Sequence, residues 1–171
     1  EEFVESQSGS FTQSVRWCGV KRDWRHEAVI SRDRQGKIRA SALVLVKRFP
    51  LPFKSFLYTP RGPVWDGRDA DALNDIMQGL EMLAKKHHAY SCKLDPLVEE
   101  TDSEAICTLQ EAGLRFCPWV PDDLNIQCRN NYILELKGRS EEELLKSFKS
   151  KCRYNIGLAQ RKGVRCASWG K

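Results

Sequence analysis

The sequence predicts one α/β (α+β) domain built around a mixed β-sheet. Three observations favour this class. Residues 26–49 alternate in polarity on both sides of a short polar turn, which is typical of a β-hairpin. Residues 69–88 carry apolar side chains three and four positions apart, which is typical of an amphipathic helix. Further short patterns of both kinds follow one another, so helices are interleaved with strands along the chain.

In the first third of the chain, residues 11–21 have apolar side chains at helical spacing and predict a short first helix. The hairpin at 26–49 turns at residues 34–37, which are Arg-Gln-Gly-Lys. Residues 56–65 are predicted as a strand interrupted by Pro60-Arg61-Gly62-Pro63, because prolines lack amide donors and hold the preceding residues extended. We expect a bent and stiff backbone there.

Beyond the helix at 69–88, a strand at 89–96 ends at Asp95-Pro96, and a helix at 103–112 is closed by Gly113. Residues 114–120 and 131–137 are predicted as strands that flank a polar loop. The order of elements is therefore helix, three strands, helix, strand, helix, two strands and a final helix.

The final element is predicted as one helix from Ser140 to Gly163. Ser140 and Glu143 form a capping box, and three successive acids suit the positive end of a helix. Two stripes run along it: an apolar one of Leu145, Phe148, Cys152, Ile156 and Ala159, and a largely cationic one of Lys146, Lys149, Arg153, Gly157 and Gln160. We expect the apolar stripe to be buried. The cationic stripe either faces a ligand or is an ordinary solvated surface.

Length and composition limit the classes of protein to which this chain can belong. The chain has 171 residues, of which 41% are hydrophobic and 30% charged. A domain of this size buries about 70% of the surface that its unfolded chain exposes. No apolar run approaches the ~18 residues that a membrane-spanning helix needs, and no signal-peptide pattern is present. We therefore expect a soluble, cytoplasmic protein.

Charge is unevenly distributed. Residues 1–60 have 11 cations and 6 anions, residues 61–136 have 7 and 14, and residues 137–171 have 10 and 3, within a net charge of +5. Basic ends suggest a polyanionic partner that contacts both of them, and scattered solvated charge is the alternative.

Motifs of several enzyme classes are absent from the sequence. It has no GxSxG, P-loop, GxGxxG or HExxH motif, which disfavours most enzymes that rely on a protein nucleophile. Seven cysteines without a CxxC pair argue against a disulfide framework and a zinc site, so we expect reduced thiols and no bound metal. The three histidines, at 26, 87 and 88, are expected in surface or core roles.

Two groups of residues could carry chemistry. The cations Lys21, Arg22 and Arg25 lie near two tryptophans, Trp17 and Trp24, and could bind phosphate with aromatic support. Packing of the tryptophans on the core is the alternative.

Asp95 forms the second candidate, because it ends a hydrophobic strand, where α/β sheets present their ligand sites. A turn-capping role is the alternative for this carboxylate.

Four motifs occur in the order in which they occur in a known family: TQSVRWCGVK, YTPRGPVWD, KLDP and ILELKGRSEEELLKSFKSKCRYNIGLAQRKGV. Together they resemble the Fem family (FemABX) of peptidoglycan interpeptide-bridge aminoacyltransferases. The resemblance extends from about residue 9 to residue 165. Its most specific signals are YxPRGPVxD and KxRYNIxxAxRKGV.

The resemblance implies a fold of two tandem lobes, each related to the GNAT acetyltransferase fold. Residues 1–136 would form the first GNAT-like lobe, with a mixed sheet flanked by helices. Residues 137–171 would form a basic helix and the start of a truncated second lobe. Members of the family are about twice as long, so the chain is expected to be a fragment that is inactive alone.

The resemblance also implies the reaction. Family members take an amino acid from aminoacyl-tRNA and join it to the stem-peptide amine of a peptidoglycan precursor, either lipid II or a UDP-linked muropeptide. The tRNA is a co-substrate and no cofactor is needed. Peripheral contact with the inner membrane leaflet is expected when the acceptor is lipid-linked.

The implied site residues can be placed by number. Asp95 matches an aspartate proposed to assist proton removal, and Lys21 matches a lysine that contacts the precursor phosphate. The other expected substrate-binding residues are Trp17, Arg61, Arg153 and Tyr154.

Two alternatives remain from the residues alone. A GNAT N-acetyltransferase that uses acetyl-CoA would need a Gly-rich turn entering a helix, and no such turn precedes the helices at 69–88 or 103–112. A noncatalytic RNA-binding module would use the basic helix for affinity alone. Transfer from charged tRNA to the precursor separates the second alternative from the Fem assignment.

Overall fold

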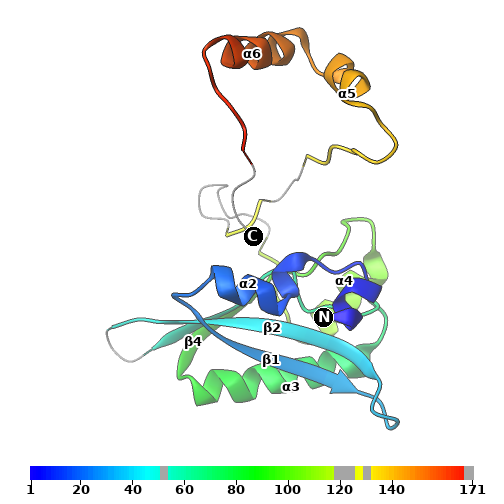
Figure 1. Ribbon diagram of the computed structural model, residues 1–171. Helices are drawn as coiled ribbons and strands as arrows, with labels where there is room; N and C mark the ends of the chain where they lie inside the picture. Colours follow the sequence, from blue (N-terminus) through cyan, green and yellow to red (C-terminus); the bar gives the residue numbers. More distant parts are fainter. Residues whose placement is uncertain (51–53, 118–125, 129–131, 168–171) are drawn as a thin grey trace. The chain divides into compact units, whose positions relative to one another are not determined.

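The computed structural model describes residues 1–50, 54–117, 126–128 and 132–167 (Figure 1). The chain forms two compact units, Glu1–Gln127 and Cys128–Lys171. No helix among the described residues has the length and apolar character needed to cross a bilayer.

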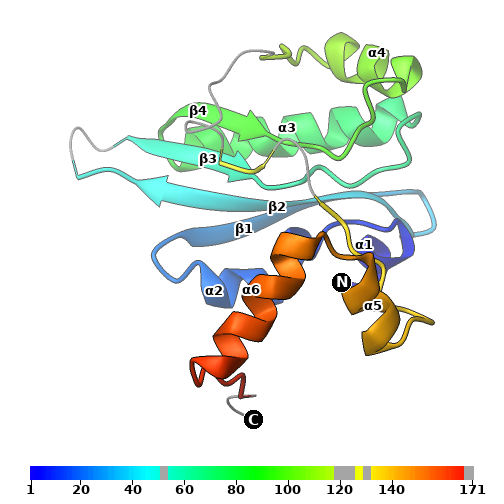
Figure 2. The same ribbon diagram turned by 90° about the horizontal axis from the view of Figure 1, so that it is seen from above.

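The first unit is built on a four-stranded sheet. Its strands are β1 (Arg25–Arg32), β2 (Ile38–Arg48), β3 (Ser55–Thr59) and β4 (Ala89–Leu94). They lie side by side in the order β1-β2-β3-β4, as Figure 2 shows. The first two pairings are antiparallel and β3–β4 is parallel. The predicted mixed α/β fold, with helices flanking the sheet, is confirmed.

Helix α3 (Ala70–Lys86) packs on one face of this sheet. Its apolar positions fall on one side at helical spacing, and the residues Ala72, Leu73, Ile76 and Leu80 are all buried. The facing strand residues include Ala42, Val44, Val46 and Leu57, which are at most 1% exposed. This layer is the hydrophobic core, and it confirms the helix predicted from the period of residues 69–88.

Short helices complete the first unit. They are α1 (Glu2–Ser6), a 3₁₀ turn η1 (Phe11–Gln13), α2 (Val15–Val20) and α4 (Ser103–Glu111). Figure 1 shows α2 on the opposite face of the sheet from α3. The single first helix predicted over residues 11–21 is therefore wrong in detail. Ser14 is extended and divides it, and its side chain caps α2 by accepting a hydrogen bond from the Trp17 N–H.

The two strands predicted late in the chain are not formed where the structure describes them. Residues 114–117 and 132–136 have no regular secondary structure, and residues 118–120 and 131 lie outside the described residues. Both segments contain apolar side chains at short spacing, but a strand also needs a hydrogen-bonded neighbour, and no pairing involves the described parts.

The second unit contains two helices where one is predicted. Helix α5 (Glu141–Ser147) has the expected capping box of Ser140 and Glu143, and α6 (Ser150–Arg161) ends before Gly163, which has φ +79°. The chain is extended at Phe148, with ψ 150°, so the single helix from Ser140 to Gly163 is wrong.

This break also changes the two predicted stripes of the final helix. The cationic stripe is divided between α5 and α6. No residue of either helix is buried, and Leu145 is 41% exposed, so the expectation of a buried apolar stripe is wrong as well.

Candidate functional site

The site begins where the chain leaves β3. Strand β3 pairs with β2 only as far as Tyr58, and the next contact between the two segments is the bridge from Ser41 to Val64. The prolines at 60 and 63 prevent regular pairing in between. The main-chain groups of Leu43 on β2 therefore face a gap in the ladder.

Gln13 fills this gap with its side-chain amide. Its Oε1 accepts a hydrogen bond from the Leu43 N–H at 2.8 Å, and its Nε2 donates to the Pro60 carbonyl at 2.6 Å. The Thr12 hydroxyl donates to the same carbonyl at 3.2 Å. Gln13 is 5% exposed. A buried amide group thus takes the place of the missing strand, because it offers the same donor and acceptor as a peptide.

Arg61 follows in the left-handed region, with φ +52°. For a residue other than glycine this conformation costs about 1–3 kcal/mol and persists only where the surroundings hold it. The Asp95 N–H supports it by donating to the Gly62 carbonyl at 3.2 Å. A Cβ on Gly62 would lie 2.7 Å from the side chain of Gln13, so only glycine fits there.

Asp95 is brought to this turn because β4 runs parallel to β3 and ends beside it. Its Oδ1 lies 3.6 Å from Nη1 of Arg61, and its Oδ2 accepts a hydrogen bond from the Tyr58 hydroxyl at 3.2 Å. The Asp95 side chain is 27% exposed and that of Arg61 is 13% exposed. The carboxylate is therefore oriented by two partners and still reachable from solvent.

Tyr58 is held as a hydrogen-bond donor. Burial first, and then the charge of the Asp95 carboxylate, raises the pKa of Tyr58 well above its usual range, so the phenol stays protonated at neutral pH. The Gln127 side chain also hydrogen-bonds Tyr58, and this contact acts in the opposite direction on the pKa. Since the phenol donates to Asp95, Gln127 donates to the phenol oxygen, and the three groups form a chain.

This arrangement can accept a proton without a protein nucleophile. A partly exposed carboxylate with a fixed orientation is suited to act as a general base toward an amine or a hydroxyl. Within the described part of the chain, no group of three or more His, Cys, Asp or Glu residues could hold a metal ion.

Lys21 and Trp17 form a separate pair. The Lys21 ammonium lies 5.5 Å from the centroid of the Trp17 ring, at the end of α2, and that ring meets Phe11 edge-on at 5.4 Å. A cation over an aromatic face keeps its charge available to an anion on its other side. The expected cleft shared by Lys21 and Asp95 stays a prediction.

Arg153 and Tyr154 lie on α6 in the second unit. Arg153 donates to the Phe148 carbonyl and, at 3.3 Å, to the Lys146 carbonyl, so it satisfies carbonyl groups at the end of α5. Tyr154 is 61% exposed, and the Arg161 guanidinium lies 5.9 Å from its ring centroid. The structure therefore gives Arg153 a local structural role that the sequence did not suggest.

Sequence reasoning missed Tyr58 and Gln127 as members of the Asp95 site. Tyr58 falls inside the quoted YTPRGPVWD motif, so its position was visible although its role was not. Gln127 lies in a polar loop with no local signal. Both join Asp95 only through the parallel pairing of β3 with β4 and the return of the chain at residue 127.

Comparisons with known proteins identify the family of this chain. A model of the FemAB family matches residues 1–170. A lipid II:glycine glycyltransferase of Staphylococcus aureus (strain MRSA252) is 31% identical over 96% of this chain and 40% of that protein, and another from Staphylococcus aureus is 30% identical with the same coverage. The crystal structure of FemX superposes with a TM-score of 0.70 at 27% identity, over 94% of this chain and 41% of that one.

The chain thus spans about 40% of the length of the curated relatives that it matches. The family model covers almost every residue, and the solved relative shares the fold. This chain belongs to the FemAB family.

Proposed function

We propose that this chain is part of an aminoacyltransferase that moves an amino acid from aminoacyl-tRNA to the stem-peptide amine of a peptidoglycan precursor. The names of the relatives, lipid II:glycine glycyltransferase, support a lipid-linked acceptor and a role in building the interpeptide bridge. A UDP-linked muropeptide is the alternative acceptor, because it offers the same stem-peptide amine.

The observation that carries the proposal is the Asp95 carboxylate held between Tyr58 and Arg61. An aminoacyl ester is already activated, so the acceptor amine can attack its carbonyl carbon directly. The new C–N bond forms, the ester C–O bond breaks, and the tRNA ribose hydroxyl leaves. The attacking amine must lose one proton, and the enzyme mainly aligns the partners and accepts that proton. In this proposal Asp95 accepts it.

In this proposal Tyr58 orients the Asp95 carboxylate, and Arg61 acts on the negative charge that develops on the attacked carbonyl oxygen. Arg61 lies beside the carboxylate in a turn whose backbone is fixed by Gln13, so its guanidinium can stabilise an oxyanion without prior movement. The Tyr58 hydroxyl keeps the carboxylate oriented. Hydrogen bonds to charged groups of this kind contribute about 1.5–3 kcal/mol each.

Residues outside the Asp95 cluster have proposed substrate-binding roles. Lys21, supported by Trp17, would bind the precursor diphosphate, and Arg153 and Tyr154 on α6 would contact substrate. The lobe boundary after residue 136 and the inactivity of the 171-residue chain alone stay predictions. Because aminoacyl-tRNA is a cytoplasmic substrate, the reaction would occur in the cytoplasm, at the inner leaflet when the acceptor is lipid-linked.

The test is Asp95→Asn in the full-length protein, with Asp71→Asn as the control. Asp71 is an exposed aspartate in the first turn of α3, and it undergoes the same chemical change. Transfer of radiolabelled amino acid from charged tRNA to lipid II is measured. We expect kcat to fall about 10²–10⁴-fold for Asp95→Asn, since a general base contributes that much, and to stay within twofold for the control.

A kcat for Asp95→Asn within threefold of the wild type would remove Asp95 as the base. Binding of tRNA without any transfer by the wild-type protein would instead favour the noncatalytic RNA-binding module.

A further inference from the structure

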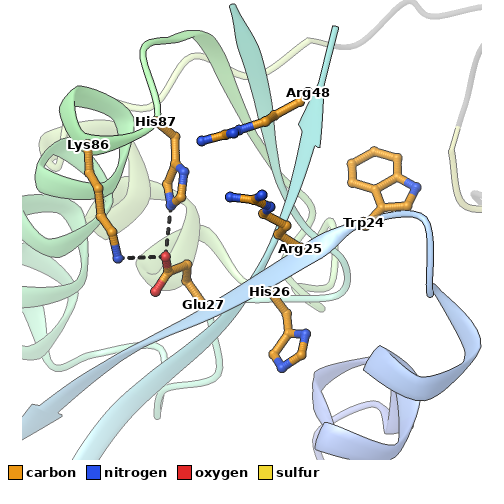
Figure 3. Close-up of a pocket in the computed structure, with 7 residues that line it drawn as sticks. All are labelled: Trp24, Arg25, His26, Glu27, Arg48, Lys86 and His87. Atoms are coloured by element: carbon orange, nitrogen blue, oxygen red, sulfur yellow. Dashed lines mark hydrogen bonds and ion pairs between the residues drawn. The ribbon is translucent and has the colours of Figure 1, made fainter.

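A second group of charged residues surrounds a hollow of about 610 Å³ in the first unit (Figure 3). Arg25, Glu27, Arg48, Lys86 and His87 are among the residues that line it. None of them belongs to the Asp95 cluster. A hollow of this volume is within the range of small-ligand sites.

Strand register places two arginines on one face of the sheet. Arg25 is the first residue of β1 and pairs with Val46 of β2, and Arg48 follows Val46 by two positions. Side chains two positions apart in a strand point to the same face. Val46 is 1% exposed in the core against α3, so both arginines lie on the face that α3 covers, beside the end of that helix.

The Glu27 carboxylate, which lines the hollow, already has two partners. Glu27 Oε1 accepts a hydrogen bond from the Lys86 ammonium at 2.7 Å and lies 2.8 Å from Nε2 of His87. These two contacts, with Lys86 first, lower the pKa of Glu27 below its usual value. Glu27 therefore neutralises Lys86, and among the described residues no second acidic side chain lines the hollow beside the two arginines.

The two guanidinium groups are free for a ligand. Across the described ranges of the chain, no ion pair involves Arg25 or Arg48. Figure 3 shows both side chains turned into the same space beside the His87 ring, whereas His26 points away from it.

His87 supplies an independent sign of a missing partner. Its side chain is 6% exposed, and Nε2 is taken by Glu27. The other ring nitrogen, Nδ1, is buried and has no hydrogen-bond partner among the described residues. In Figure 3 it lies on the side of the ring that faces the arginines. Buried polar atoms usually have a partner, and an unpaired one beside a hollow is open to a water, an ion or a ligand group.

We propose that this hollow, here called the arginine pocket and defined by Arg25, Arg48 and His87, binds a phosphate group. Guanidinium forks match the oxygen spacing of phosphate and donate two hydrogen bonds each. Two unpaired guanidinium charges balance a phosphate dianion, and the unpaired Nδ1 of His87 adds a further hydrogen-bonding atom. The remaining volume admits the substituent of a phosphate ester.

Titration with inorganic phosphate at constant ionic strength tests the pocket. Binding is followed by the NMR signals of the arginine Nε–H groups. We expect saturable shifts at Arg25 and Arg48, and at least tenfold weaker binding in Arg25→Gln and in Arg48→Gln. The control is Lys54→Gln, which removes one positive charge just before β3, the neighbour of β2, from a side chain that does not line the hollow. It should bind phosphate within twofold of the wild type.

Melting temperatures confirm that each variant is folded. Equal weakening by Lys54→Gln would show that only the general surface charge attracts phosphate, and would overturn the pocket. Absence of saturation in the wild type at tens of millimolar phosphate would overturn it as well.

The source of the phosphate is distinguished by competition. Uridine diphosphate and a short single-stranded RNA are each titrated against bound inorganic phosphate, in the wild type and in Arg48→Gln. Displacement by the nucleotide assigns the pocket to small phosphate esters, and displacement by the RNA assigns it to a nucleic-acid backbone. Displacement by neither assigns it to the free ion. Because these titrations need no acyl transfer, their outcome is separate from that of the Asp95 test.

Discussion

The side chain of Gln13 replaces a strand partner that the prolines at 60 and 63 remove. Its amide bonds the main chain of Leu43 on one side and of Pro60 on the other, and the turn that carries Arg61 is fixed as a result. A residue remote from the chemistry thus determines where a charged group of the site lies. Local sequence marks Gln13 only as part of a motif.

Replacing Gln13 tests this role. In Gln13→Leu the buried Leu43 N–H loses its partner, whereas the Pro60 carbonyl keeps the hydrogen bond from the Thr12 hydroxyl. One unsatisfied buried group costs about 1–3 kcal/mol, so we expect the free energy of unfolding in urea to fall by about 1–3 kcal/mol. The matched control is Gln78→Leu, at an exposed position of α3, where a change within about 0.5 kcal/mol is expected. Equal stability of the two variants would contradict the bracing role.

Between elements, a close approach lies where α3 crosses β1. A Cβ placed on Gly79 would overlap Cγ1 of Val29, closer than any real contact. Gly79 is buried, and valine is stiff at χ1, so neither partner can yield easily. A glycine in a helix interior costs about 1 kcal/mol relative to alanine. Here that cost is offset by the close packing of helix on sheet.

Two glycine-to-alanine changes should have opposite effects. Gly79→Ala should lower the free energy of unfolding of the first unit by about 1–3 kcal/mol, because overpacking forces the helix and sheet apart. Gly157→Ala in α6 would meet only the flexible end of Arg161, at 3.3 Å, and should increase helicity. Urea denaturation and far-UV circular dichroism measure the two results. A stabilised Gly79→Ala would show that α3 does not depend on this contact.

At the scale of the whole molecule, the buried core lies within one of the two units. The core residues of the sheet, α3 and α4 all precede residue 128, whereas no residue of α5 or α6 is buried. Helices of 7 and 12 residues are marginal in water without tertiary packing. The first unit has the means to fold by its own contacts, whereas the described part of the second contains no buried residue.

Expression of residues 1–127 and of residues 128–171 as separate chains tests this division. The first chain should unfold in urea in one cooperative transition, because it retains the core and the Gln127 contact to Tyr58. The second should show low helicity without a cooperative melt. A non-cooperative transition for residues 1–127 would mean that the first unit needs the rest of the chain for its core.

The sequence by itself determined the elements whose signals are local. The hairpin at 26–49, the helix at 69–88 and the capping box of Ser140 and Glu143 follow from polarity period and terminal residues within a few positions of one another. It also singled out Asp95, because the end of a hydrophobic strand is recognisable from its neighbours alone.

Only the tertiary structure decided which distant groups meet. Tyr58 reaches Asp95 across 37 positions, and Gln13 reaches Pro60 across 47. Such contacts depend on strand register and on the path of the connections, which no local periodicity encodes. The division of the last helix at Phe148 has the same reason. Polarity predicts a continuous amphipathic helix, but tertiary packing supplies most of the stability of a helix. No residue of α5 or α6 is buried, so this contribution is absent from both helices.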